Sequence, residues 1–273
     1  MDFEDRKVRR QVWLTLFAAL LLWGLLRLAF GPLPQDPAYH RFADTRTLLG
    51  VIPRAGDVLT NLAILGAAIF GWALRPRMAL AMNERAAANL LIAGTALTAL
   101  GSAYYHQFPN NATLLWDRLP MTLTIMPALV LVLADRVHPL FARRALWPFT
   151  VFAAASVVFW AWSETTGAGD VWLYAVVRIG PAVLIPLLLI LRAPRYTGSP
   201  WLVTAVVLQV VLVVFEYFDH EIFAASGGVA SGHNLKHVTV GATLACLFIW
   251  LRVRRPRAPA PSSAAQEAVT GDQ

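Results

Sequence analysis

Long apolar runs separated by short polar links dominate the pattern of the chain. A helix needs about 20 mostly apolar residues to cross the hydrocarbon core of a membrane. Runs of roughly this length, two of them shorter, predict eight helices, at residues 12–30, 57–74, 86–107, 119–134, 145–163, 171–191, 201–218 and 232–250. No gap between them is long enough for a soluble domain. The pattern therefore predicts an all-α, polytopic transmembrane helix bundle.

The polar segments divide the chain into three parts. Residues 1–56 hold a cytoplasmic N-terminus, the first helix and an outer loop, residues 57–252 hold a core of seven helices, and residues 253–273 form a tail. The tail is rich in Arg, Pro, Ala and Ser, a composition too polar to bury a core, so we expect it to be disordered and cytoplasmic. The basic start before the first helix also fits a cleaved signal, and the other seven helices keep their orientation in either case.

The composition excludes several classes of protein. Of the 273 residues, 58% are hydrophobic and 14% charged, whereas soluble domains are about 45–50% apolar and about 25% charged. This excludes a soluble globular enzyme and a disordered chain, and the single cysteine, Cys246, excludes a disulfide scaffold. The net charge of +7 is compatible with a nucleic-acid partner, but the arginines lie between apolar runs and form no single basic patch. We expect no nucleic acid to bind.

Basic residues alternate between the two sides of the predicted bundle. Cytoplasmic loops carry the excess of Lys and Arg. One side has Arg6, Lys7, Arg9, Arg10, Arg75, Arg77, Arg85, Arg136, Arg143, Arg144, Arg192, Arg195, Arg252, Arg254, Arg255 and Arg257, and the other has only Arg41, Arg46, Arg54 and Arg118. Both termini are then cytoplasmic. Arginine greatly exceeds lysine and alanine is abundant, which suggests a GC-rich genome, and so a bacterial inner membrane with the polar face toward the periplasm.

Polar residues collect at the outer ends of five helices. His233 and His237 are four apart on the last helix, so they share a face with Cβ atoms about 5–6 Å apart. Two imidazoles placed in this way can bind one metal ion, and His106 at the outer end of the third helix would complete a set of three ligands. Three protein ligands leave one position open, which is the catalytic form of a zinc site.

Two further residues supply groups for hydrolysis. Zinc can activate water and polarise a carbonyl oxygen. Asp117, close behind His106 in sequence, can take the proton of that water, and Ser102, one turn below His106, can donate a hydrogen bond to the oxyanion. The assembled set predicts metal-assisted hydrolysis of an amide or ester that is reached from the lipid.

Each of these residues also has a structural interpretation. Taken alone, Ser102 would be explained by a hydrogen bond from its hydroxyl to the carbonyl four residues back. Asp117 alone would be explained as the cap of the fourth helix. His40 and His138 fit solvated loops. Lys236 is expected to point away from the histidine pair and to extend toward lipid headgroups, whereas Glu216 lies close enough to its helix to need a partner.

The set as a whole resembles the alkaline ceramidase family, whose superfamily includes the progestin and adiponectin receptors. The likeness lies in Ser102-x-x-x-His106, Asp117 at the start of the next helix and His233-x-x-x-His237 on the last. The local sequence Gly101-Ser102-Ala103-Tyr104-Tyr105-His106 is similar to sequences in bacterial ceramidase-like membrane proteins. The likeness spans the second to the eighth helix, the length of the family's seven-helix hydrolase core, and the first helix is an addition.

The resemblance implies a zinc-dependent amidase that releases a fatty acid and a sphingoid base from a ceramide-like membrane lipid. It implies zinc on His106, His233 and His237, proton transfer by Asp117 and stabilisation of the oxyanion by Ser102. The match departs at residues 43–48, where only Asp44 remains of an acidic calcium-binding stretch, and at Ala55 in place of a later Glu. Calcium needs several oxygen ligands, so we do not expect a calcium site.

Two other classes of function compete with the amidase. A receptor-like or structural membrane protein would use its zinc to brace helices without chemistry. A transporter fits less well, because the helices show no inverted repeat and the polar residues lie at one face and not at the midplane. The sequence leaves the lipid and the oligomeric state open.

Overall fold

The structure is a computed structural model that describes residues 3–257, and within that range it is all-α and contains no strand. Eight helices are long and apolar enough to cross a membrane. These are α1 (Phe3–Phe30), α3 (Asn61–Leu74), α4 (Arg85–Gln107), α5 (Asn111–Arg136), α7 (Leu146–Thr165), α8 (Trp172–Leu191), α9 (Ser199–Tyr217) and α11 (Gly232–Val253). Shorter helices are α2 (Ala55–Leu59), α6 (Phe141–Arg144) and α10 (Asp219–Ala225). The expectation of an all-α bundle of membrane-spanning helices is confirmed.

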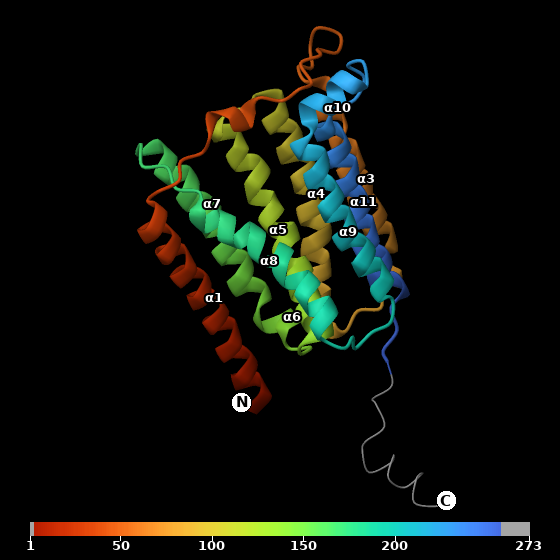
Figure 1. The fold of residues 1–273 in the computed structure, drawn as a ribbon. Helices are drawn as coiled ribbons and strands as arrows, with labels where there is room; N and C mark the ends of the chain where they lie inside the picture. Colours follow the sequence, from red (N-terminus) through yellow and green to blue (C-terminus); the bar gives the residue numbers. More distant parts are fainter. Residues whose placement is uncertain (1–2, 258–273) are drawn as a thin grey trace, which may run out of the picture.

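The helices form an up-and-down bundle with α1 at its side (Figure 1). The tightest packing joins α4 to α5, α11 to α9 and α11 to α3. By contrast, α1 packs against α8, α6 and α7, and only 6% of its apolar window is buried. Both described ends of the chain lie at the end of the bundle opposite α10 (Figure 1). The first helix is therefore an addition to a seven-helix bundle.

The helix α5 begins eight residues before the expected start at residue 119. Asn110 caps it: its side chain accepts a hydrogen bond from the Thr113 N–H at 3.0 Å, and the Thr113 hydroxyl accepts one from the Asn110 N–H. The expected start at residue 119 left the charged pair Asp117-Arg118 outside the helix. Both side chains instead line an internal cavity, which allows charges inside an otherwise apolar helix.

Residues 253–257, the start of the predicted tail, pack against the bundle. Within residues 253–257, Arg254 is only 1% exposed. Its guanidinium forms an ion pair with Glu84 and lies 4.8 Å from the ring centre of Trp250. The expectation that the chain is disordered from residue 253 is wrong at this point, because a buried carboxylate and an aromatic ring hold the arginine. Residues 258–273, the rest of that predicted tail, lie outside the described residues.

Two glycines of α4 face two prolines of α5. Proline has no N–H, so Pro120 and Pro127 leave the carbonyls of Trp116 and Leu123, four residues earlier, without their helical hydrogen bonds. A Cβ at Gly101 would lie 1.9 Å from the Trp116 oxygen, and one at Gly94 would lie 2.4 Å from the Leu123 oxygen. Each freed carbonyl thus points at the backbone of α4. Small residues at such a contact allow two membrane helices to approach closely.

Substitution of Gly101 tests this contact. Gly101→Ala places a methyl group against a backbone carbonyl that cannot turn aside, so we expect the free energy of unfolding to fall by about 1–3 kcal/mol. Gly66→Ala is the matched control, because a Cβ at Gly66 in α3 meets nothing within 4 Å. Thermal unfolding of both variants in detergent measures the difference. Equal stability of the two variants would contradict the close approach of α4 and α5.

Candidate functional site

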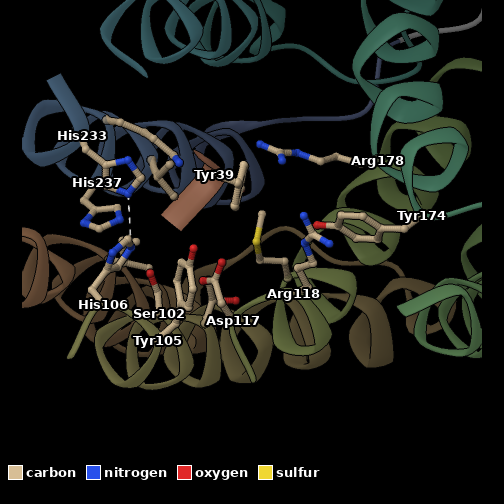
Figure 2. A pocket seen from close by; sticks show the side chains of 15 residues that line it. Tyr39, Ser102, Tyr105, His106, Asp117, Arg118, Tyr174, Arg178, His233 and His237 are labelled. Atoms are coloured by element: carbon tan, nitrogen blue, oxygen red, sulfur yellow. Dashed lines mark hydrogen bonds between the residues drawn. The ribbon is translucent and has the colours of Figure 1, made fainter. Parts of the chain in front are cut away.

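Three histidines from α4 and α11 meet inside the bundle. His106, His233 and His237 are 2–5% exposed, and their ligand atoms all lie within 4.8 Å of one another. The Nε2 atoms of His106 and His233 are 3.2 Å apart (Figure 2). Two nitrogens bound to one tetrahedral zinc ion at 2.0–2.1 Å are separated by about 3.3–3.4 Å. The spacing therefore fits a shared metal ion.

Neighbouring residues fix the orientation of the histidine rings. The Thr60 hydroxyl donates to the Gly56 carbonyl at 2.7 Å, so its oxygen accepts from Nδ1 of His237 at 3.0 Å. This assigns the proton of His237 to Nδ1 and leaves Nε2 free as a ligand. One ring nitrogen of the cluster, the buried Nδ1 of His106, is left without a hydrogen-bond partner among the described residues.

The start of α11 is held by two carboxylates from other elements. Ser231 caps the helix, and its side chain accepts from the Asn234 N–H at 3.0 Å. Asp219 accepts from the His233 N–H at 2.7 Å, and Asp57 accepts from the Asn234 amide at 2.6 Å. A carboxylate at a helix N-terminus is favourable because it faces unpaired N–H groups. These contacts position His233 and His237 relative to the rest of the bundle.

Ser102 and Asp117 line the same cavity as the three histidines (Figure 2). Ser102 lies one turn before His106 on α4 and is 3% exposed. Several threonines bond to the carbonyl four residues back, as Thr95 does, but we find no such bond for Ser102 among the described residues. Asp117 lies in the second turn of α5, whose cap is Asn110, so it does not serve as that helix's N-cap. The structure thus brings together all five residues singled out from the sequence.

The outer loop covers the histidines, which the sequence did not indicate. The ring centre of Phe42 lies 4.6 Å from that of His106 and 4.7 Å from that of His233. The next residue, Ala43, donates its N–H to Asp219 at 2.9 Å. A lone phenylalanine in a loop carries no signal of this role. Residues 1–56 therefore contribute to the site, although we had separated them from the core.

Three further side chains of the cavity come from the outer loop, α8 and α11. Tyr39, Arg178 and Lys236 line it together with the histidines, and the arginine inside α8 was a signal that sequence reasoning missed. The expected direction of Lys236 is wrong: its Nζ lies 2.5 Å from Glu216, and its side chain is only 13% exposed. Glu216 on α9 is the counter-ion that keeps this lysine inside the bundle. The expectation that Glu216 needs a partner is thereby met.

His40 also differs from expectation. It bonds to the Tyr105 hydroxyl and to the Asn111 side chain, each at 2.9 Å, and so joins the outer loop to α4 and α5.

Asp44 is paired with a guanidinium. It is fully buried, and its two oxygens accept from Nε and Nη2 of Arg46 at 2.8 and 2.6 Å. Burial opposes ionisation, but the hydrogen bonds and the charge of Arg46 prevail and lower the pKa of Asp44. The one acidic residue left at the position of the calcium-binding stretch thus has an arginine as its partner.

Comparisons of the chain with models of protein families, with curated proteins and with solved structures find no match. The resemblance to the ceramidase family therefore stays an expectation, and the geometry of the site carries the functional argument.

Metal content tests the histidine cluster. We expect protein purified without chelator to hold about one zinc ion per chain, and His233→Ala to lose it, because two imidazoles bind zinc far more weakly than three. Thr60→Val removes the partner of His237 and should weaken zinc binding by about 10–100-fold. His220→Ala alters an exposed histidine and is the control. Metal analysis of the variants measures this, and a metal-free wild-type protein from zinc-supplemented cells would contradict it.

The contribution of the Asp44–Arg46 ion pair to the stability of the fold depends on pH. Because the pKa of Asp44 in the folded protein lies below the ordinary value of 3.8, the pair stabilises the fold fully above that value. The contribution is lost as the pH falls through the lower, folded pKa. Arg46→Gln should therefore lower the thermal stability at neutral pH, and the deficit should shrink below pH 3.8. A deficit that does not vary with pH would count against the pair; Arg41→Gln, in the same loop, is the control.

Proposed function

We propose that the protein is a zinc-dependent intramembrane hydrolase that cleaves the amide bond of a ceramide-like lipid to a fatty acid and a sphingoid base. One observation carries the proposal: three buried imidazoles converge on one point in a cavity that also holds Ser102 and Asp117. Three nitrogen ligands with a neighbouring carboxylate are typical of catalytic zinc sites, which keep one position open.

His106, His233 and His237 would hold the metal. When bound, zinc supplies Lewis acidity toward a carbonyl oxygen and makes water a better nucleophile near neutral pH.

The other side chains handle protons and charge. The carboxylate of Asp117 accepts a proton from the attacking water, which adds to the amide carbon. The hydroxyl of Ser102 donates a hydrogen bond to the carbonyl oxygen as negative charge develops on it. Asp117 then passes its proton to the amide nitrogen, the C–N bond breaks, and the amine and the fatty acid form. The buried cavity strengthens these interactions because little water competes with them.

We further propose that the protein lies in a bacterial inner membrane with both termini in the cytoplasm and the site near the periplasmic face. The uneven distribution of arginine between the two ends of the helices supports this orientation. A lipid amide would then be bound close to the outer leaflet's headgroups.

Turnover of a fluorescent ceramide in mixed micelles tests the function. We expect Asp117→Asn to lower kcat/KM by about 10²–10⁴-fold because the proton acceptor is lost. Ser102→Ala should lower kcat by about 10²–10³-fold because the oxyanion loses a donor. Glu221→Gln alters an exposed carboxylate and should leave turnover unchanged.

Zinc content and melting temperature are measured on the same samples. A wild-type protein that binds zinc, melts at lower temperature after chelation and cleaves no lipid amide would contradict the proposal. It would favour the alternative, a receptor-like or structural membrane protein with a non-catalytic zinc site.

A further inference from the structure

Arg118 lies at the end of the cavity opposite the histidines, with Asp117 between them (Figure 2). Its side chain is surrounded by aromatic rings: its Cζ atom lies 4.2 Å from the ring centre of Trp160, 4.7 Å from that of Tyr174 and 5.4 Å from that of Tyr39. Arg118 is 4% exposed. Contacts with three aromatic rings therefore fix the position of this guanidinium.

Several hydrogen-bonding atoms at this end of the cavity have no partner. Arg118 donates from Nη2 to Gln35 at 2.6 Å, but its Nε and Nη1 atoms are buried and unpaired within residues 3–257. The hydroxyl of Tyr174 is likewise buried and unpaired there. Buried donors without a partner destabilise a fold, and charged donors do so most. Three such atoms beside one cavity indicate a missing acceptor.

The charges around the cavity indicate what that acceptor is. Three cationic side chains line it, Arg118, Arg178 and Lys236, together with one carboxylate, Asp117. Glu216 already pairs with Lys236. Two guanidinium groups therefore face a single carboxylate, and one positive charge is left over even with Asp117 ionised. A buried charge needs a counter-ion, and a guanidinium binds planar or tetrahedral oxyanions through paired N–H groups.

We propose that Arg118, with Tyr174, binds an anionic oxygen group on the substrate, so that an acidic lipid amide is preferred to its neutral counterpart. Arg178 supplies the second positive charge. The inference rests on the proposed function. It names the class of substrate: an N-acyl amine whose amine half carries a carboxylate, phosphate or sulfonate.

The anionic group belongs to the amine half because the acyl carbonyl has a different place. The carbonyl reacts beside the histidines, Ser102 and Asp117, whereas Arg118 lies beyond Asp117 (Figure 2). An acyl chain leads from the carbonyl into lipid and carries no charge. A short substituent on the nitrogen side can extend past Asp117, the residue that returns the proton to that nitrogen, and reach Arg118.

Two matched amides test the proposal in zinc-loaded protein in neutral detergent. N-dodecanoylglycine carries a carboxylate, and N-dodecanoylethanolamine is its neutral counterpart. We expect kcat/KM to be at least about tenfold higher for the acidic amide, since a hydrogen-bonded charge pair supplies a difference of that size. In Arg118→Gln the ratio of the two values should fall to about one. Equal ratios in the wild type and in Arg118→Gln would overturn the proposal.

Two further variants distinguish loss of the anion site from a folding defect in Arg118→Gln. Tyr174→Phe removes only an oxygen without a partner among the described residues, so the fold should tolerate it, and the preference for the acidic amide should fall several-fold. Arg41→Gln removes an exposed loop arginine and should change neither substrate's turnover. An unchanged preference in a well-folded Tyr174→Phe would exclude the tyrosine from the subsite.

A binding measurement separates this inference from the hydrolase proposal. Dodecyl phosphate has no amide bond, so its affinity does not depend on turnover. We expect it to bind at least about tenfold more tightly to wild type than to Arg118→Gln, and inorganic phosphate alone to compete weakly. Tight binding without cleavage of either amide would contradict the proposed hydrolase but keep the anion site. Cleavage of both amides without preference, and no effect of Arg118→Gln on binding, would refute the anion site alone.

Discussion

The close approach of α4 and α5 is the constraint on which the site depends. Pro120 and Pro127 each free a carbonyl, and glycine is the residue that leaves room for a carbonyl on the facing helix. The two contacts are seven residues apart on both helices, so they repeat along one face. They bring the outer half of α5, with Asp117, against the turn of α4 that carries Ser102 and His106. Without them an ordinary separation of about 8–10 Å between helix axes would apply.

Many of the polar side chains around this pair of helices have a hydrogen-bond or ion-pair partner. Glu216 neutralises Lys236, Asp219 and Asp57 occupy N–H and amide groups at the start of α11, and Asp44 is held by Arg46. In a membrane, where a charged side chain is expensive, such pairing is what permits so many polar residues in one bundle. In the cavity itself, by contrast, Nδ1 of His106, two nitrogens of Arg118 and the hydroxyl of Tyr174 have no hydrogen-bond partner among the described residues.

Much of the fold and part of the site could be predicted from the sequence. Apolar runs alone predicted the eight long helices, because a bilayer demands length and low polarity. The pair His233 and His237 was visible because helical spacing is local. Lys236 was placed wrongly although it lies only three residues after His233, since its direction depends on Glu216 on another helix. Phe42 and Tyr39 come from a loop whose path no periodicity describes, and Arg178 reaches the site only through the packing of α8 against its neighbours.

Phe42 has a consequence for the exchange of any metal ion that the three histidines could hold. With the ring lying against His106 and His233 and the adjoining backbone bonded to Asp219, access from the side of the outer loop requires local opening of that loop. The lifetime of a metal ion held by the three histidines would then depend on the rate of that opening as well as on the strength of its coordination.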